Sequence, residues 1–104
     1  MNRYLINRDI TEEELRSSIN QHIAIVFPVI AMRHTANKGW LCDKKNGEEV
    51  GVNFQPFEVN SDDQHIHARG WARILTPIRS AQVRVECEFP KSGGDSYMEV
   101  VGTE

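Results

Sequence analysis

A stripe of basic and aromatic side chains is the part of the sequence best suited to chemistry. If residues 64–75 form one strand, alternate side chains from His65 to Arg73 lie on the same face of the sheet. Arginine and histidine can bind anions and tryptophan can stack on a flat ring, which is how some sheet surfaces bind nucleotides. Together with one arginine of the next strand, the predicted binding residues are His65, His67, Arg69, Trp71, Arg73 and Arg84.

Acidic residues on the next predicted strand compete with this interpretation. Glu86 and Glu88 are expected to face Arg69 and His67, and so to neutralise much of the stripe. The stripe contains one aromatic ring, whereas sheets that bind nucleic acid stack bases on two or three. The whole chain also carries a net charge of −3. We therefore rank nucleic acid below a protein or small-molecule partner.

Two histidines on one side of a strand, His65 and His67, are similar to part of the metal site of cupin β-barrels. That pattern also requires a carboxylate a few residues later and a further histidine. Here Trp71 and Ala72 take the place of the carboxylate, and no histidine follows His67. The ordinary interpretation is an exposed histidine that pairs with Glu88. We predict no bound metal and no cofactor.

No group of residues has the spacing of a known catalytic motif. A nucleophile elbow of the Gly-x-Ser-x-Gly type is absent. Residues 93–95, Gly-Gly-Asp, are similar to a loop of nucleotide cyclase domains, but the residues that follow differ, and we predict a hairpin turn. His67 with Glu88, or His34 with Asp43, could do acid–base work only if a pocket lies beside them. We expect a binding module rather than an enzyme, with a small-ligand enzyme of a roll-type fold as the alternative.

Composition and charge are those of an ordinary globular domain. The chain has 104 residues, of which 39% are hydrophobic and 26% are charged, and it shows no repeat or linker, so we expect one domain over residues 1–104. The longest apolar run, residues 23–32, is about half the length of a membrane span, and the N-terminus lacks a signal-peptide pattern. We therefore expect a cytoplasmic protein without membrane contacts, in which Cys42 and Cys87 are free buried thiols.

The clearest local signal is the start of a helix at Thr11. Thr11 and Glu14 have the spacing of a capping box, and Leu15 and Ile19 fall on one helical face. The pattern predicts a helix over residues 12–20. Strands are predicted on either side of it, at residues 2–7 and at residues 22–33, the second with Pro28 at a bulge or an edge position.

Two hairpins complete the predicted sheet. Asn46-Gly47 is a strong turn signal between strands at residues 39–45 and 48–55. Residues 76–79 form a turn between residues 64–75 and 80–89. Pairing Leu75 with Ser80 places His67 opposite Glu88, Arg69 opposite Glu86, Trp71 opposite Arg84 in a cation–π pair, and Arg73 opposite Gln82. The other face then pairs small residues with larger ones, Ala68 with Cys87, Gly70 with Val85 and Ala72 with Val83.

These elements predict an α+β fold, in which one N-terminal helix packs on a curved antiparallel sheet of about five to six strands arranged as a roll-like meander. Ala68, Gly70 and Ala72 leave room for the helix to approach the sheet. The layout is similar to that of cystatin and nuclear-transport-factor-type rolls, without a shared motif. A mostly-β barrel or sandwich with a short helix is the alternative. We expect a homodimer, because Trp71 is exposed and an open meander leaves strand edges unpaired.

Overall fold

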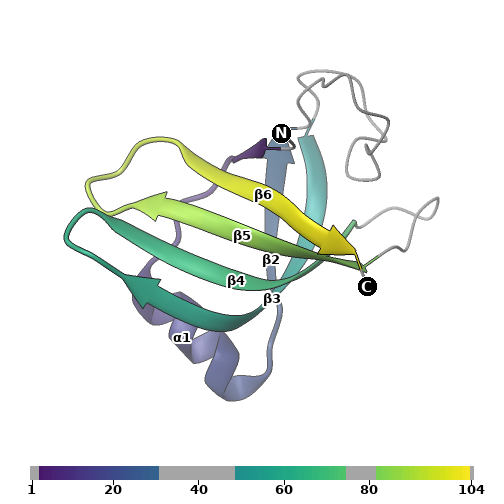
Figure 1. The fold of residues 1–104 in the computed structure, drawn as a ribbon, viewed down its shortest axis with the longest axis horizontal. Coiled ribbons are helices and arrows are strands. Elements are labelled where there is room, and N and C mark those ends of the chain that lie inside the picture. Colours follow the sequence, from purple (N-terminus) through teal and green to yellow (C-terminus); the bar gives the residue numbers. More distant parts are fainter. Residues whose placement is uncertain (1–2, 31–48, 75–81, 104) are drawn as a thin grey trace.

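The described chain, which comprises residues 3–30, 49–74 and 82–103 of a computed structural model, forms six antiparallel strands and one helix. The elements are β1 (Arg3–Ile6), α1 (Glu12–Gln21), β2 (Ile25–Ile30), β3 (Glu49–Ser61), β4 (His65–Ile74), β5 (Gln82–Pro90) and β6 (Ser96–Thr103). Each strand pairs with the next strand in sequence, and β6 pairs with β1, so that the sheet closes into a barrel (Figure 1).

Closure of the sheet distinguishes the two predicted architectures. The antiparallel sheet and the N-terminal helix are confirmed, and the alternative of a mostly-β barrel with a short helix describes their arrangement. Closure depends on β1, which pairs with β6 from Arg3↔Glu99 to Ile6↔Ser96 and with β2 at Leu5↔Ile30. Because each described strand has a neighbour on both sides, the argument for a homodimer from unpaired edges no longer applies. The homodimer remains a prediction.

The inside of the barrel is apolar because alternate residues of each strand point inward. The largest fully buried side chains include Tyr4, Leu15, Phe27, Phe54, Phe89 and Met98. The rings of Phe27 and Phe54 lie 5.6 Å apart at a tilt of 53°, as aromatic pairs prefer. Cys87 is a free buried thiol as predicted, and burial raises its pKa. The interior of the described barrel is therefore packed, and chemistry is to be sought on its outer face.

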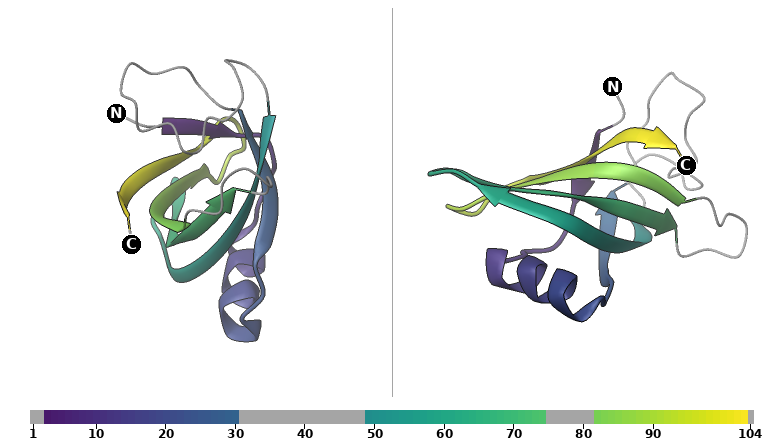
Figure 2. Two further views of the ribbon diagram at one scale, coloured as in Figure 1. Left: turned by 90° about the vertical axis from the view of Figure 1, so that its right-hand side faces the viewer. Right: turned by 60° about the horizontal axis from the view of Figure 1, so that its bottom comes forward.

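Helix α1 begins where the sequence predicts and packs beside β3. The Thr11 Oγ1 atom accepts a hydrogen bond of 3.1 Å from the Glu14 N–H. β3 pairs with β2 only as far as Phe54↔Ile25, and the helix lies along the rest of β3 (Figure 2). Leu15 is completely buried. The helix thus covers the part of β3 that has no β2 neighbour.

The close approach at Gly70 involves the neighbouring strand and not the helix. A Cβ atom on Gly70 would lie 2.3 Å from the carbonyl oxygen of Gln55 and 2.8 Å from Cε1 of Phe54. The expectation that the helix approaches the sheet over Ala68, Gly70 and Ala72 is therefore wrong. The Phe54 side chain and the β3 backbone at Gln55 and Pro56 occupy that space.

Pro28 lies inside β2 without loss of a hydrogen bond to β3. Its carbonyl accepts a hydrogen bond of 2.9 Å from the Asn7 N–H, one residue beyond the end of β1. The N and O atoms of one strand residue point to the same neighbour, so the missing N–H of Pro28 faces the side where β1 has ended. The sequence predicts a bulge or an edge position here. In the structure β2 has neighbours on both sides and pairs with β3 without a bulge, and Pro28 lies where the pairing of β2 with β1 ends.

Several predictions concern residues outside the described ranges. These are the turn at Asn46-Gly47, the strand at residues 39–45, the turn at residues 76–79, and the side chains of His34, Cys42 and Asp43. The predicted pairing of residues 48–55 with residues 39–45 is wrong at residues 52–54, where β3 has β2 on one side and β4 on the other. Within the described ranges, no helix is long and apolar enough to cross a membrane.

Two β-bulges flank the β4–β5 hairpin. The hairpin register matches the prediction at every described position, from Ile66↔Phe89 to Arg73↔Gln82. β3 pairs with β4 at Pro56↔Gly70 and next at Glu58↔Arg69, which leaves Phe57 unopposed. β6 pairs with β5 at Val100↔Val85 and next at Gly102↔Arg84, which leaves Val101 unopposed. Since Gly70 pairs with Val85, both bulges lie at the same level of the barrel.

Candidate functional site

The level of the two bulges divides the outer face of the barrel into two parts. On one side lies the charge ladder, which consists of Arg3, Glu58, His67, Arg69, Glu86, Glu88, Tyr97 and Glu99. On the other side lies the arginine face, which consists of Phe57, Trp71, Arg73 and Arg84. The predicted binding residues are therefore split between two surfaces. His67 and Arg69 belong to the charge ladder, and Trp71, Arg73 and Arg84 belong to the arginine face. His65 lies at the end of the ladder that is next to the β3–β4 turn.

Each arginine of the charge ladder faces a carboxylate. The Arg69 guanidinium lies 3.3 Å from Glu86 and 3.3 Å from Glu58, and that of Arg3 lies 3.6 Å from Glu88. These side chains are about half exposed, so each pair contributes only about 0–1 kcal/mol to stability. The ladder holds two arginines and four glutamates. It therefore repels anions while His67 is neutral.

The predicted histidines lie beside the turn that joins β3 and β4. The ring centroids of His65 and His67 are 6.0 Å apart, and His67 lies 3.9 Å from Glu88 and 3.7 Å from Asp62. The N–H groups of Gln64 and His65 donate to Asp62 Oδ1 and hold the pKa of this carboxyl below its usual range. Among the residues that the structure describes, no three histidine, cysteine or acidic side chains are placed to hold a metal ion.

The arginine face carries two aromatic rings where the sequence predicts one. The bulge turns Phe57 outward, and its ring centroid lies 6.2 Å from that of Trp71 at a tilt of 56°. Phe57 is 44% exposed, although phenylalanine is a residue that folding usually buries. The pair offers an apolar platform on which a flat ring can stack.

Neither arginine of the arginine face meets a carboxylate in the described chain. Arg73 donates a hydrogen bond of 3.3 Å to Gln82 Oε1. Arg84 lies against Gly102, where a Cβ atom would be 3.1 Å from its Nη2 atom. A guanidinium group without an acidic partner can bind carboxylate or phosphate with two parallel hydrogen bonds.

The predicted cation–π contact between Arg84 and Trp71 does not form, although the two residues are paired in register. In the described chain the arginine that stacks on a ring is Arg3, which lies 4.4 Å over Tyr97. The Arg84 guanidinium lies instead against Gly102, on the next strand, which has no side chain to occupy that space. The Trp71 ring is left to Phe57 and to solvent.

A pocket of about 220 Å³ opens beside Trp71. Its lining is mostly amide and small side chains, namely Ala24, Asn53, Gln55, Trp71, Ala72, Arg73 and Gln82. The Oδ1 atom of Asn53 is shielded from solvent and has no hydrogen-bond partner in the described chain. An unsatisfied buried acceptor costs about 1–3 kcal/mol, so this atom would gain from a ligand that brings an N–H group.

No protein-family model matches the chain. The searches of curated proteins and of solved structures also returned no match. The function has to be inferred from the site itself.

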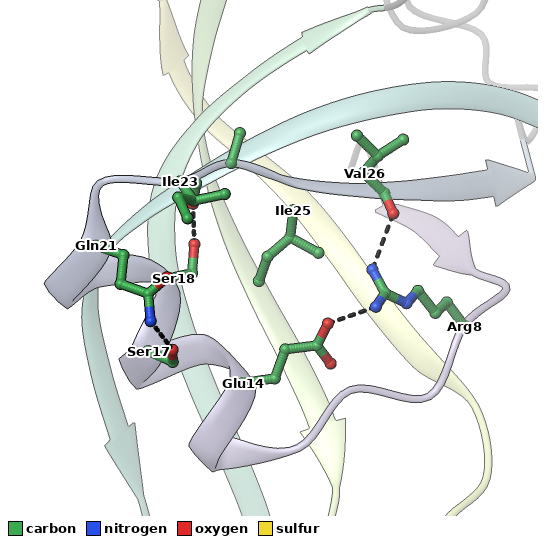
Figure 3. A pocket seen from close by; sticks show the side chains of 9 residues that line it. Arg8, Glu14, Ser17, Ser18, Gln21, Ile23, Ile25 and Val26 are labelled. Carbon is green, nitrogen blue, oxygen red and sulfur yellow. Dashed lines mark hydrogen bonds and ion pairs between the residues drawn. The ribbon is translucent and has the colours of Figure 1, made fainter.

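Two more pockets bear on the enzyme alternative. One lies beside the His67–Glu88 pair on the charge ladder, so the condition set for acid–base work by this pair is met there. The other separates α1 from β2 (Figure 3). Its polar groups already have partners. Arg8 donates to the Val26 carbonyl at 2.9 Å and to Glu14, and the Ser18 hydroxyl donates to the Ile23 carbonyl. Because Arg8 and Glu14 are the charged residues of this pocket and pair with each other, it offers no free group for acid–base catalysis.

Sequence reasoning found three residues of the arginine face and missed Phe57. The predicted strand ends at Gln55, whereas β3 continues to Ser61. A signal was present, because apolar residues alternate at Val50, Val52 and Phe54 and resume out of phase at Phe57 and Val59. Such a change of phase is what a β-bulge produces.

Proposed function

We propose that this protein is a binding module that holds an anionic ligand with a planar ring against the arginine face. The proposal depends on one observation. The bulge sets Phe57 beside Trp71, next to two arginines that meet no carboxylate in the described chain. A ligand ring can stack on the aromatic pair while the guanidinium groups hold its negative charge.

The electrostatics of the outer face support this choice of surface. An anion near Arg69 meets Glu58 and Glu86 at the same time, because both lie 3.3 Å from that guanidinium. An anion near Arg73 meets the neutral Gln82 instead. The attraction is therefore concentrated at the arginine face, although the whole chain has a net charge of −3.

A protein partner is the second candidate for the same surface. Phe57 and Val101 are 44% and 40% exposed, and aromatic residues and arginine dominate the binding energy of protein interfaces. The predicted homodimer is one such case, since a second copy of the chain could cover the arginine face. A dimer of this kind would compete with ligand binding. Sedimentation of the protein with and without ligand distinguishes the two.

The test uses the planar trianion 8-hydroxypyrene-1,3,6-trisulfonate as the probe. Its fluorescence anisotropy is followed as it is titrated with the protein at low and at physiological salt. We expect binding that weakens as salt rises, as for any contact made by guanidinium groups. The variant Arg73→Ala/Arg84→Ala should weaken binding about tenfold or more, because two charge-assisted contacts are lost.

The matched control is Arg69→Ala, which removes an arginine from the same strand but from the charge ladder. It should change probe affinity less than about twofold, because Arg69 already pairs with two carboxylates. Equal losses in both variants would show that only total charge matters and would overturn the proposal. So would a stable dimer in which Trp71 is protected and no probe binds.

A further inference from the structure

We infer that the ligand of the arginine face is an adenine nucleotide, either free or within a short single strand. The inference rests on the proposed function and adds the identity of the ring. It is carried by the buried amide oxygen of Asn53, which has no hydrogen-bond partner in the described chain and belongs to a residue that lines the pocket beside Trp71.

The Asn53 side chain has the hydrogen-bonding pattern that matches adenine. An asparagine or glutamine amide presents an acceptor and a donor side by side, and adenine offers N6–H and N7 in the complementary order. The Oδ1 atom of Asn53 is buried and meets no donor within the described chain. Because this atom is closed to solvent, the Asn53 side chain must turn toward the pocket on binding, and an N6 amino group of the ligand then supplies that donor.

The register places the three parts of such a site within the span of one nucleotide. Asn53 pairs with Arg73 across β3 and β4, and Gln55 pairs with Trp71 one step along the same face. Side chains that are directly opposite on neighbouring strands lie about 5 Å apart at Cβ. A base that stacks near Trp71 and bonds to Asn53 can therefore direct its phosphate toward Arg73.

The pocket has room for a base edge. Two of its lining residues are alanines, Ala24 and Ala72, and its volume is about 220 Å³. Gln55 and Gln82 line it as well and can donate to or accept from a base edge. The pocket thus has several polar side chains, and the one buried side-chain atom without a hydrogen-bond partner among the described residues is an acceptor.

The charge ladder limits how long a bound strand can be. It begins on the other side of the bulge level, at Glu58 and Glu86, so a chain of phosphates that extends past Trp71 meets carboxylates. A long polyanion is repelled there. The surface therefore fits one nucleotide, or a few, and not an extended nucleic acid.

The experiment compares adenosine 5′-monophosphate with purine riboside 5′-monophosphate, which lacks only the N6 amino group. Affinities are measured by isothermal titration calorimetry, with ribose 5-phosphate as the ligand without a base. We expect adenosine monophosphate to bind about tenfold more tightly than the purine analogue, in line with one good base contact. The variant Asn53→Ala should abolish this difference, and its melting temperature is measured as the control for folding.

A short oligonucleotide separates the two sources of the base. If hexaadenylate binds no more tightly than the mononucleotide, the ligand is a free nucleotide, and if it binds more tightly with a steeper salt dependence, the ligand is a single strand. Equal binding of the two monophosphates, or an unchanged preference in Asn53→Ala, would overturn the inference. The proposed function would still hold after that result if binding of the trianion probe depended on Arg73 and Arg84. If probe binding did not depend on these arginines, the proposed function would be overturned as well.

Discussion

The charge ladder and the arginine face occupy the same two strands, yet their arginines are in opposite situations. Arg69 is paired in register with Glu86, and Arg73 is paired with Gln82. One cross-strand residue thus decides whether an arginine forms a structural ion pair or remains able to bind something else. The difference shows that a basic stripe on a strand is informative only after its opposite strand is known.

The boundary between the two surfaces is a change in backbone geometry. At the level of Gly70 and Val85 each flanking strand contains one extra residue, and both extra residues, Phe57 and Val101, are exposed and apolar. A bulge increases the local twist and redirects side chains. The aromatic pair therefore owes its existence to the same irregularity that ends the ladder.

Substitution of Gly70 should disturb the boundary between the two surfaces more than any other change proposed here. In Gly70→Ala the new Cβ atom would lie 2.3 Å from the Gln55 carbonyl oxygen, so the backbone of β3 must move. We expect a loss of about 3 kcal/mol in the free energy of unfolding, measured with urea. The control is Gly102→Ala, where the new atom meets only the flexible end of Arg84, and the loss should stay below about 1 kcal/mol. Similar losses in both variants would contradict the close approach at Gly70.

The aromatic pair can be broken without disturbing the fold. Phe57→Ala removes the ring that lies 6.2 Å from Trp71, and we expect about a fivefold loss of affinity for the trianion probe. The other bulge residue provides the control, because Val101→Ala also removes an exposed apolar side chain and should leave the affinity unchanged. The idea of a stacking platform fails if Phe57→Ala binds the probe as well as the unmodified protein does.

A third variant tests the comparison by removing the carboxylates that pair with Arg69, so that this arginine resembles those of the arginine face. The double variant Glu58→Gln/Glu86→Gln removes both carboxylates that lie 3.3 Å from Arg69. Probe affinity should rise about twofold to threefold at low salt, and the gain should shrink as salt screens the exposed charges. A gain of the same size in the variant Glu12→Gln/Glu13→Gln, which changes the net charge equally on α1, would mean that the effect is not local.

The smallest expected effect concerns Asp62, at the end of the ladder. Its pKa in the folded state is lowered by hydrogen bonds from the Gln64 and His65 N–H groups, so its ionised form stabilises the fold above the unfolded pKa. This contribution is lost as the pH falls through the folded pKa. The unmodified protein should therefore have a higher melting temperature than Asp62→Asn at about pH 6. The two melting temperatures should approach each other at about pH 3. A constant difference across this range would contradict the cause given for the shift.

Local features of this fold could be predicted from the sequence, and the closure of the sheet could not. The register of the β4–β5 hairpin follows from small residues that oppose larger ones, as in Gly70↔Val85, and the helix start follows from Thr11 and Glu14. Closure depends on Arg3↔Glu99 and its neighbours, which join the two ends of the chain. A strand of four residues at the N-terminus carries too little pattern to name its partners.

The part of the candidate site that lies in the β4–β5 hairpin could be predicted, and the part that comes from β3 could not. Trp71, Arg73 and Arg84 lie within the hairpin whose register could be worked out, so their shared face was expected. Phe57 comes from the next strand and reaches the surface only because of a bulge. Asn53 could not be recognised, since an amide oxygen without a hydrogen-bond partner can be found only when the positions of all its neighbours are known.

The bulge at Phe57 has a consequence for how this surface can evolve. If Phe57 were absent, inward and outward residues would alternate regularly along β3. Pro56 and Val59 are both buried, and Glu58 would then be the single residue between them. A gene could thus gain or lose this one codon without moving any other side chain to the wrong face of the barrel. Related sequences with and without the codon would share the barrel and differ in the platform, so ligand binding could arise or disappear in a single step.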